Sequence, residues 1–183
     1  MRIALTSTFL FLFFASFSQE NKNTIITQFG FLGGLNHSVV NGKDSVGAKI
    51  GYIGTELYAG FFADSRLSSK WNLENELLFS WTDDYHFIEV PIHLKYKFSD
   101  RWAAFFGPKL DFIVDDDNDP FESYYKFRNF GISVDMGIQF NILKRLFAEG
   151  RFSKSFTQQI TDHGLDINNA KRNTFRIGVG FRF

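Results

Sequence analysis

The chain has 183 residues, with 20 Lys and Arg against 20 Asp and Glu, 25 Phe and no Cys. This length suits a single domain. The even charge balance gives no reason to expect nucleic acid as a partner, and the absence of Cys excludes disulfides and thiolate metal sites.

The N-terminal segment resembles a secretory signal peptide. One early charge, Arg2, precedes an apolar run over residues 9–15, and small residues follow at Ser16 and Ser18. We expect cleavage after Ser18, so that residues 1–18 are the signal peptide and residues 19–183 form the mature domain. The alternative is an uncleaved membrane anchor, but the apolar run is shorter than the ~20 residues that a spanning helix needs.

Eight segments of the mature chain are predicted strands, because apolar and polar residues alternate in them with a period of two. The stretch FIEVPIHLKYKF (87–98) shows the pattern most clearly, with Ile88 and Val90 on one face and Glu89 and His93 on the other. These segments exceed the ~5–6 residues usual in globular proteins and suit tilted membrane-spanning strands of ~9–11 residues with some extension. The eight segments are approximately 24–36, 51–64, 70–82, 86–98, 101–114, 125–141, 145–157 and 172–183.

The connections between these segments alternate in length. Long loops are expected at residues 37–50, at the acidic stretch DDDNDPFES (115–123) and at residues 158–171, and short turns lie between them. Outer-membrane barrels place short turns at the periplasmic end and longer loops outside. The sequence therefore predicts an all-β fold, an eight-stranded antiparallel up-and-down transmembrane β-barrel.

Two further features favour an apolar face that points to lipid. Aromatic side chains with a polar group gather at the strand ends, where such rings sit at headgroup depth. The chain also ends on Phe183, in phase with the apolar face of its last strand, which resembles the signal read by the barrel-assembly machinery. The predicted aromatic girdle consists of Trp71, Trp81, Tyr96, Trp102, Tyr124 and Tyr125.

The charged face would then line the lumen. The interior of an eight-stranded barrel is filled by side chains, so acids and bases are expected to pair across it. Lys97 and Arg182 share this face. The predicted lumen charge network consists of Glu56, Glu74, Glu76, Glu89, His93, Lys95, Lys109, Asp111, Asp135, Glu149, Arg151 and Arg176.

Pro91 lies within the fourth predicted strand and has no backbone N–H to donate. Proline cannot donate to a strand ladder and is found at edges or bulges. Because a closed barrel has no edge, the sequence predicts a local bulge at residue 91.

No catalytic or metal-ligating motif is found. Of the four His, only His93 is predicted to face the lumen, and as a base it would need a nucleophile such as Ser153 or Ser155. The acidic stretch at 115–120 lacks the Gly and Glu of an EF-hand loop. We therefore expect no cofactor, no metal and no enzymatic activity.

Six stretches, taken in order, resemble the PorT-like outer-membrane β-barrel family of Bacteroidota. They share its order of long strand, short turn, E-x-P and G-P-x-x over residues 29–183. The resemblance implies an eight-stranded barrel in a Gram-negative outer membrane, and the founding member of the family is associated with a protein-secretion and gliding apparatus. The stretches are FLGGLN, ELYAGFFADSRLSSKWNLENELLFS, FIEVPIHLKYKF, FFGPKLDFIV, FGISVDMGIQF and RNTFRIGVGFRF.

These patterns predict an exported outer-membrane barrel with a plugged polar lumen and a structural or interaction role. The expected partners are outer-membrane lipid and lipopolysaccharide, the barrel-assembly machinery, and a periplasmic or surface protein of unknown identity. Two alternatives stay open. One is a soluble calycin-like barrel whose apolar face lines a ligand cavity, and the other is a lipid-modifying barrel enzyme that uses His93.

Overall fold

The computed structural model describes residues 25–43, 46–81, 86–114, 125–127, 130–158, 160–162 and 167–183. The predicted signal peptide and the acidic stretch at 115–123 lie outside these residues. Strands make up the regular structure of the described part, and no helix in it is long and apolar enough to cross a membrane. The strands are β1 (Thr27–Lys43), β2 (Lys49–Arg66), β3 (Trp71–Trp81), β4 (His86–Lys97), β5 (Trp102–Val114), β6 (Tyr125–Phe127), β7 (Phe130–Asn141), β8 (Leu146–Ser155), β9 (Ile160–Asp162) and β10 (Ile167–Arg182).

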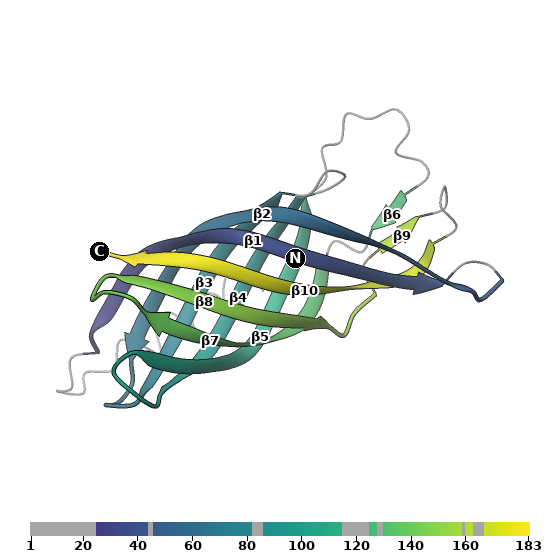
Figure 1. The fold of residues 1–183 in the computed structure, drawn as a ribbon. Helices are drawn as coiled ribbons and strands as arrows, with labels where there is room; N and C mark the ends of the chain where they lie inside the picture. The colour runs from purple at the N-terminus through teal and green to yellow at the C-terminus, as the bar shows by residue number, and fades with distance from the viewer. Residues whose placement is uncertain are drawn as a thin grey trace, which may run out of the picture.

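Eight of these strands close into an antiparallel barrel (Figure 1). Each pairs with its neighbour in the order β1-β2-β3-β4-β5-β7-β8-β10, and β1 also pairs with β10, from Gly30↔Arg182 to Lys43↔Asn168. The closing pair joins the two ends of the sheet, so the barrel has no free edge. The predicted eight-stranded antiparallel barrel is confirmed.

The barrel has a turn end and a loop end. Short turns at residues 67–70, 98–101 and 142–145 define the turn end, where the Phe183 N–H also donates to the carbonyl oxygen of Phe29 at 2.9 Å. The other connections lie at the loop end. There β6 pairs with β9 and β9 with β10 (Figure 1), so the predicted single strand over 125–141 is wrong: it divides into β6 and β7.

The first connection is also shorter than predicted. Residues 37–43 continue β1, and Lys49 already begins β2, so most of the expected loop at 37–50 is strand. The reason is that β1 has a partner on each side up to Lys43, and both ladders satisfy its backbone groups although its sequence there is polar.

The predicted bulge at Pro91 is wrong. On one side β4 pairs with β3 at Asn75↔Ile92 and again at Leu78↔Glu89, which is the same register. On the other side, Pro91 stands opposite Lys109 in an unshifted register with β5. The missing N–H interrupts the ladder beside Pro91, but no extra residue is inserted, because loss of one donor does not require a change of register.

The charged face points inward and the apolar face outward. In β4, Phe87, Glu89 and the following odd-numbered residues up to Lys95 are buried, and the residues between them are partly exposed. Large apolar side chains such as Phe61 and Ile177 are 64% and 60% exposed on the outer surface. This excludes the soluble calycin-like alternative, in which the apolar face would line the cavity.

Candidate functional site

The inward face gathers the predicted charges. All twelve residues of the predicted lumen network are buried, with exposed fractions of at most 5%. Two further buried charges, Asp64 and Arg172, belong with them, and sequence reasoning missed both. The alternating pattern could have identified both residues. Asp64 lies on the same face of its strand as Glu56, and Arg172 lies on the same face as Arg176. Each stands at the end of a predicted strand, however, where the pattern stops.

One group of charges, the loop-end cluster, occupies the half of the lumen nearer the loops. Its members joined by ion pairs are Glu56, Glu89, Lys109, Asp111, Arg172 and Arg176.

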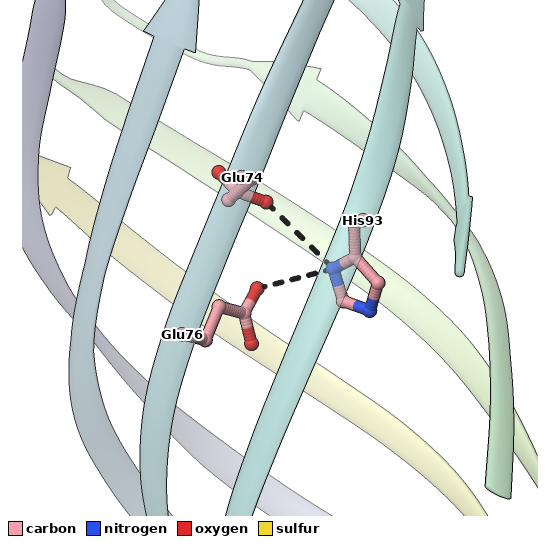
Figure 2. Close-up of side chains that lie close together, drawn as sticks. All are labelled: Glu74, Glu76 and His93. Atoms are coloured by element: carbon pink, nitrogen blue, oxygen red, sulfur yellow. Dashed lines mark ion pairs between the residues drawn. The ribbon is translucent and has the colours of Figure 1, made fainter. Parts of the chain in front are cut away.

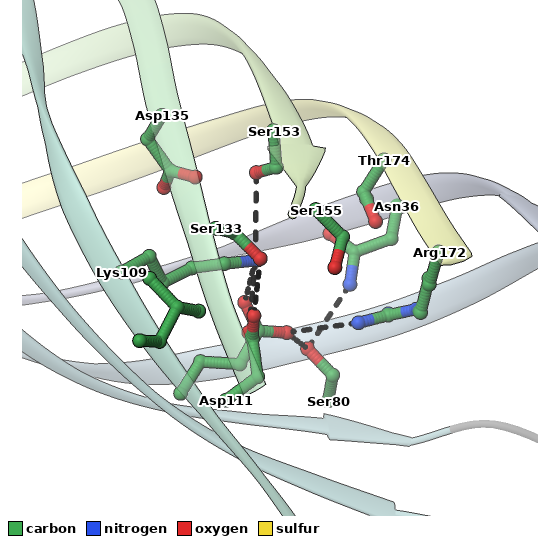
Figure 3. A network of polar contacts seen from close by, with 12 residues as sticks. Asn36, Ser80, Lys109, Asp111, Ser133, Asp135, Ser153, Ser155, Arg172 and Thr174 are labelled. Atoms are coloured by element: carbon green, nitrogen blue, oxygen red, sulfur yellow. Dashed lines mark hydrogen bonds and ion pairs between the residues drawn. The ribbon is translucent and has the colours of Figure 1, made fainter. Parts of the chain in front are cut away.

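Glu89 is the centre of the loop-end cluster. Its carboxylate accepts hydrogen bonds from Arg176 Nη2 at 2.8 and 2.9 Å and from Lys109 Nζ at 2.8 Å. Ser80 Oγ donates to it at 2.7 Å, and Arg172 lies 3.5 Å away. The Lys109 ammonium also reaches Asp111 at 3.1 Å and Ser153 at 3.5 Å (Figure 3). Each cation of this cluster therefore contacts a carboxylate.

The second group, the turn-end cluster, lies in the other half of the lumen. Its members joined by ion pairs are Asp64, Glu74, Glu76, His93, Lys95, Asp135, Glu149 and Arg151.

Arg151 and Lys95 connect the carboxylates of the turn-end cluster. Arg151 donates to both oxygens of Glu76 at 2.8 Å each and to Glu149 at 2.5 Å, a bidentate arrangement typical of strong guanidinium–carboxylate pairs. Lys95 Nζ contacts Glu74, reaches Asp64 at 3.4 Å and donates to Gln139 at 2.8 Å.

His93 lies within the turn-end cluster, surrounded by carboxylates. Its Nε2 is 3.3 Å from Asp135 Oδ2, and its Nδ1 is 3.4 Å from Glu76 Oε1 and 4.0 Å from Glu74 Oε1. Figure 2 shows Glu74 and Glu76 on one strand, both directed at the His93 ring on the next. One ligand atom from each of these three residues lies within 4.8 Å of the others. The sequence predicted no metal site, because the three residues share no ligand motif.

The lipid-modifying enzyme alternative would need a nucleophile beside His93. Ser153 Oγ instead contacts Lys109, and Ser155 Oγ donates to the Thr157 carbonyl at 2.9 Å. Within the described residues neither serine forms a hydrogen bond with His93, so this pair of nucleophile and base is not assembled. The expectation of no enzymatic activity stays a prediction.

Comparison with known proteins decides the family. Residues 9–183 match the model of the family described as the outer membrane protein beta-barrel domain. The chain belongs to this family. No curated protein matches the sequence.

Two solved barrels have the same fold as this member of the outer membrane protein beta-barrel family. Neisserial surface protein A is 13% identical, with a TM-score of 0.54 over 85% of this chain and 97% of its own. Ail, the attachment invasion locus protein of Yersinia pestis, solved with the heparin analogue sucrose octasulfate, is 12% identical, with a TM-score of 0.51 over 86% and 99%. The predicted location in the outer membrane is confirmed, and the apolar outer surface of the barrel faces lipid.

The predicted girdle residues occupy both ends of this outer-membrane barrel. At the turn end, the Trp71 and Tyr96 rings lie 4.8 Å apart, and Trp102 lies 4.7 Å from Phe140. Trp81, at the loop end, packs at 4.6 Å on Phe79. The three Trp side chains are 40–45% exposed, as expected for rings at an interface. Of the remaining two girdle residues, Tyr124 lies outside the described residues and Tyr125 belongs to β6.

Proposed function

We propose that this outer-membrane barrel does not conduct solutes and has a structural or interaction role. The observation that supports the proposal is the set of ion pairs between strands that are not neighbours. Arg151 on β8 pairs with Glu76 on β3, and Arg176 on β10 pairs with Glu89 on β4. Such contacts run across the lumen from wall to wall and leave the barrel interior filled with side chains.

Aromatic rings add to this plug. The Arg176 guanidinium lies 4.2 Å from the centre of the Tyr58 ring, and that of Arg172 lies 4.1 Å from the centre of the Phe87 ring. Cations at such distances are attracted by the ring face. Tyr58 and Phe87 therefore close the space that the charged side chains leave, and we expect no continuous water path.

Single-channel recording in planar lipid bilayers tests the plug. The wild-type protein should insert without stepwise conductance, under conditions in which a general porin gives clear steps. The double variant Arg151→Ala, Arg176→Ala removes two of the cations that pair across the lumen and should raise the current. Stable steps from the wild-type protein would show that the lumen conducts and would overturn the proposal.

The interaction role extends the resemblance to PorT-like barrels. We propose a periplasmic or surface protein partner, in the manner of a secretion apparatus, together with contacts to lipopolysaccharide. Crosslinking and pull-down from native outer membranes would test this, with an unrelated eight-stranded barrel as the control. Recovery of the same proteins with both baits would count against a specific partner.

Assembly is proposed to depend on the terminal aromatic residue. The Phe183 side chain is 64% exposed beside the lipid-facing strands, so it is accessible to the barrel-assembly machinery. The variant Phe183→Ser should accumulate less in the outer membrane than wild type, whereas Phe156→Ser, with a similar exposure of 56%, should not. Equal amounts of the two variants in the outer membrane would contradict a role of Phe183 in assembly.

A further inference from the structure

Three buried acceptor atoms converge in the turn-end cluster. We propose that Glu74, Glu76 and His93 form a binding site for one divalent transition-metal ion, held inside the barrel between β3 and β4. The three side chains are at most 4% exposed, and their ligand atoms lie within 4.8 Å of one another. This proposal is independent of the conducting state of the lumen.

The protonation pattern of the His93 ring suits a metal ligand that binds through Nδ1. Asp135 can only accept a hydrogen bond when it is ionised, so the 3.3 Å contact requires His93 Nε2 to carry the proton. In the neutral ring, Nδ1 then presents its lone pair to Glu74 and Glu76. A ligating His usually donates its other N–H to a carboxylate, which is the arrangement of Asp135 here.

Two of the converging atoms lack a hydrogen-bond partner. Glu74 Oε1 and His93 Nδ1 are both buried and form no hydrogen bond within the described part of the chain. Burying such atoms without a partner is costly. The lone pairs of Glu74 Oε1 and His93 Nδ1 also repel each other unless a positive charge lies between them. Figure 2 shows both carboxylates directed at His93 Nδ1.

Both carboxylates are already bound by a cation. Lys95 contacts Glu74 Oε2, and Arg151 donates one hydrogen bond of 2.8 Å to each oxygen of Glu76. These cations orient the carboxylates from behind and leave Glu74 Oε1 and one side of Glu76 Oε1 toward His93. Such second-layer contacts commonly fix the ligands of a metal site.

The charge balance favours an added positive charge at the three converging atoms. The turn-end cluster contains five carboxylates, and its ion-paired cations besides His93 are Lys95 and Arg151. Lys97 and Arg182 lie beside Asp64 and add two more positive charges. The carboxylates still outnumber these cations, and a metal ion held by Glu74, Glu76 and His93 supplies the missing positive charge.

The donor set indicates the class of metal. One imidazole and two carboxylates suit Zn²⁺, Mn²⁺ or Fe²⁺, and in a chain without Cys no thiolate competes. Since the site is enclosed, the ion has to enter during folding of the barrel and should then exchange slowly.

Metal analysis of the untagged full chain tests the site. The protein is refolded from urea into detergent with Zn²⁺, Mn²⁺ or Co²⁺, washed with EDTA and analysed by mass spectrometry for metal. We expect about one ion per folded chain to survive EDTA, as for a site formed on folding. Retention of none of the three ions would overturn the proposal and leave a protonated His93 in place of the metal.

Two variants and one control assign the ligands. Glu74→Gln and His93→Gln preserve side-chain size and should lose the retained ion, whereas His86→Gln, at the exposed start of β4, should keep it. Retention by the folded His93→Gln variant would exclude this site.

Heat-modifiable migration establishes which variants have folded. If neither ligand variant folds, the visible absorption of wild-type Co²⁺ protein decides. Bands of Co²⁺ bound to nitrogen and oxygen ligands that persist in EDTA support the site, and their absence overturns it.

Discussion

The two charged clusters of the lumen are built on the same barrel but differ in charge balance. The loop-end cluster matches three carboxylates with three Lys or Arg side chains. The turn-end cluster has five carboxylates, and the Lys and Arg side chains that form ion pairs with them are Lys95 and Arg151. No ion pair among the described residues joins the two clusters.

This difference shows that a filled barrel interior is not uniform electrostatically. Removing one partner of a buried ion pair leaves the other charge without compensation, which is strongly destabilising. In the loop-end cluster, loss of either an acid or a base is expected to destabilise the fold. In the turn-end cluster, loss of a cation is expected to destabilise the fold, whereas replacing one carboxylate by a neutral side chain should change the free energy of unfolding little. Four sets of variants test the comparison through the free energy of unfolding in lipid vesicles.

The largest effect is expected at Arg151. Arg151→Met should lower the free energy of unfolding by about 3–5 kcal/mol, because it leaves Glu76 and Glu149 buried without their main cation. Urea titration followed by tryptophan fluorescence measures this. A loss as small as that of the outward-facing control Lys154→Met would refute the central role of Arg151.

The next effect separates the two clusters directly. Glu89→Gln removes the carboxylate that three cations share and should cost about 3 kcal/mol. Glu149→Gln removes one of five carboxylates in the acid-rich cluster and should change the free energy of unfolding by less than about 1 kcal/mol. Equal losses in the same urea titration would show that charge balance does not distinguish the clusters.

A packing variant beside His93 comes third. A Cβ at Gly107 would lie 1.9 Å from the Ile92 carbonyl oxygen and 3.0 Å from the His93 Cα. Gly107→Ala should therefore force β4 and β5 apart at the turn-end cluster and cost about 1–3 kcal/mol. Gly150→Ala is the matched control, since a Cβ there meets no atom within 4 Å. Similar unfolding curves for the two variants would contradict the close approach.

The smallest effect is expected on the outer surface. Lys154 is exposed on the lipid-facing side of β8, toward the loop end. Lys154→Leu should raise the free energy of unfolding by about 0–1 kcal/mol, the range for a charge near the membrane interface. A gain well above this in vesicle unfolding would place Lys154 deeper in the bilayer.

Strand alternation allowed much of the fold to be predicted, because a period of two is a local property of the chain. It groups Glu74 with Glu76 and Lys95 with His93 without any knowledge of neighbours. It failed where pairing with neighbouring strands determines the secondary structure. Residues 37–43 are an example, because they form a strand through pairing with β2 and β10. It also failed at Pro91, where the register on both sides absorbs the missing donor without a bulge.

The contacts between the charged residues required the tertiary structure. The alternating pattern alone does not decide whether the apolar face or the charged face of each strand points into the barrel. In the closed barrel the charged face points inward. Closure and register together place Glu76 opposite Arg151, 75 positions away along the chain. They also set Glu74 beside His93 on neighbouring strands. The stretch FIEVPIHLKYKF thus carries its two faces in its own residues, while the partners of Glu89, His93 and Lys95 depend on where seven other strands bring their side chains.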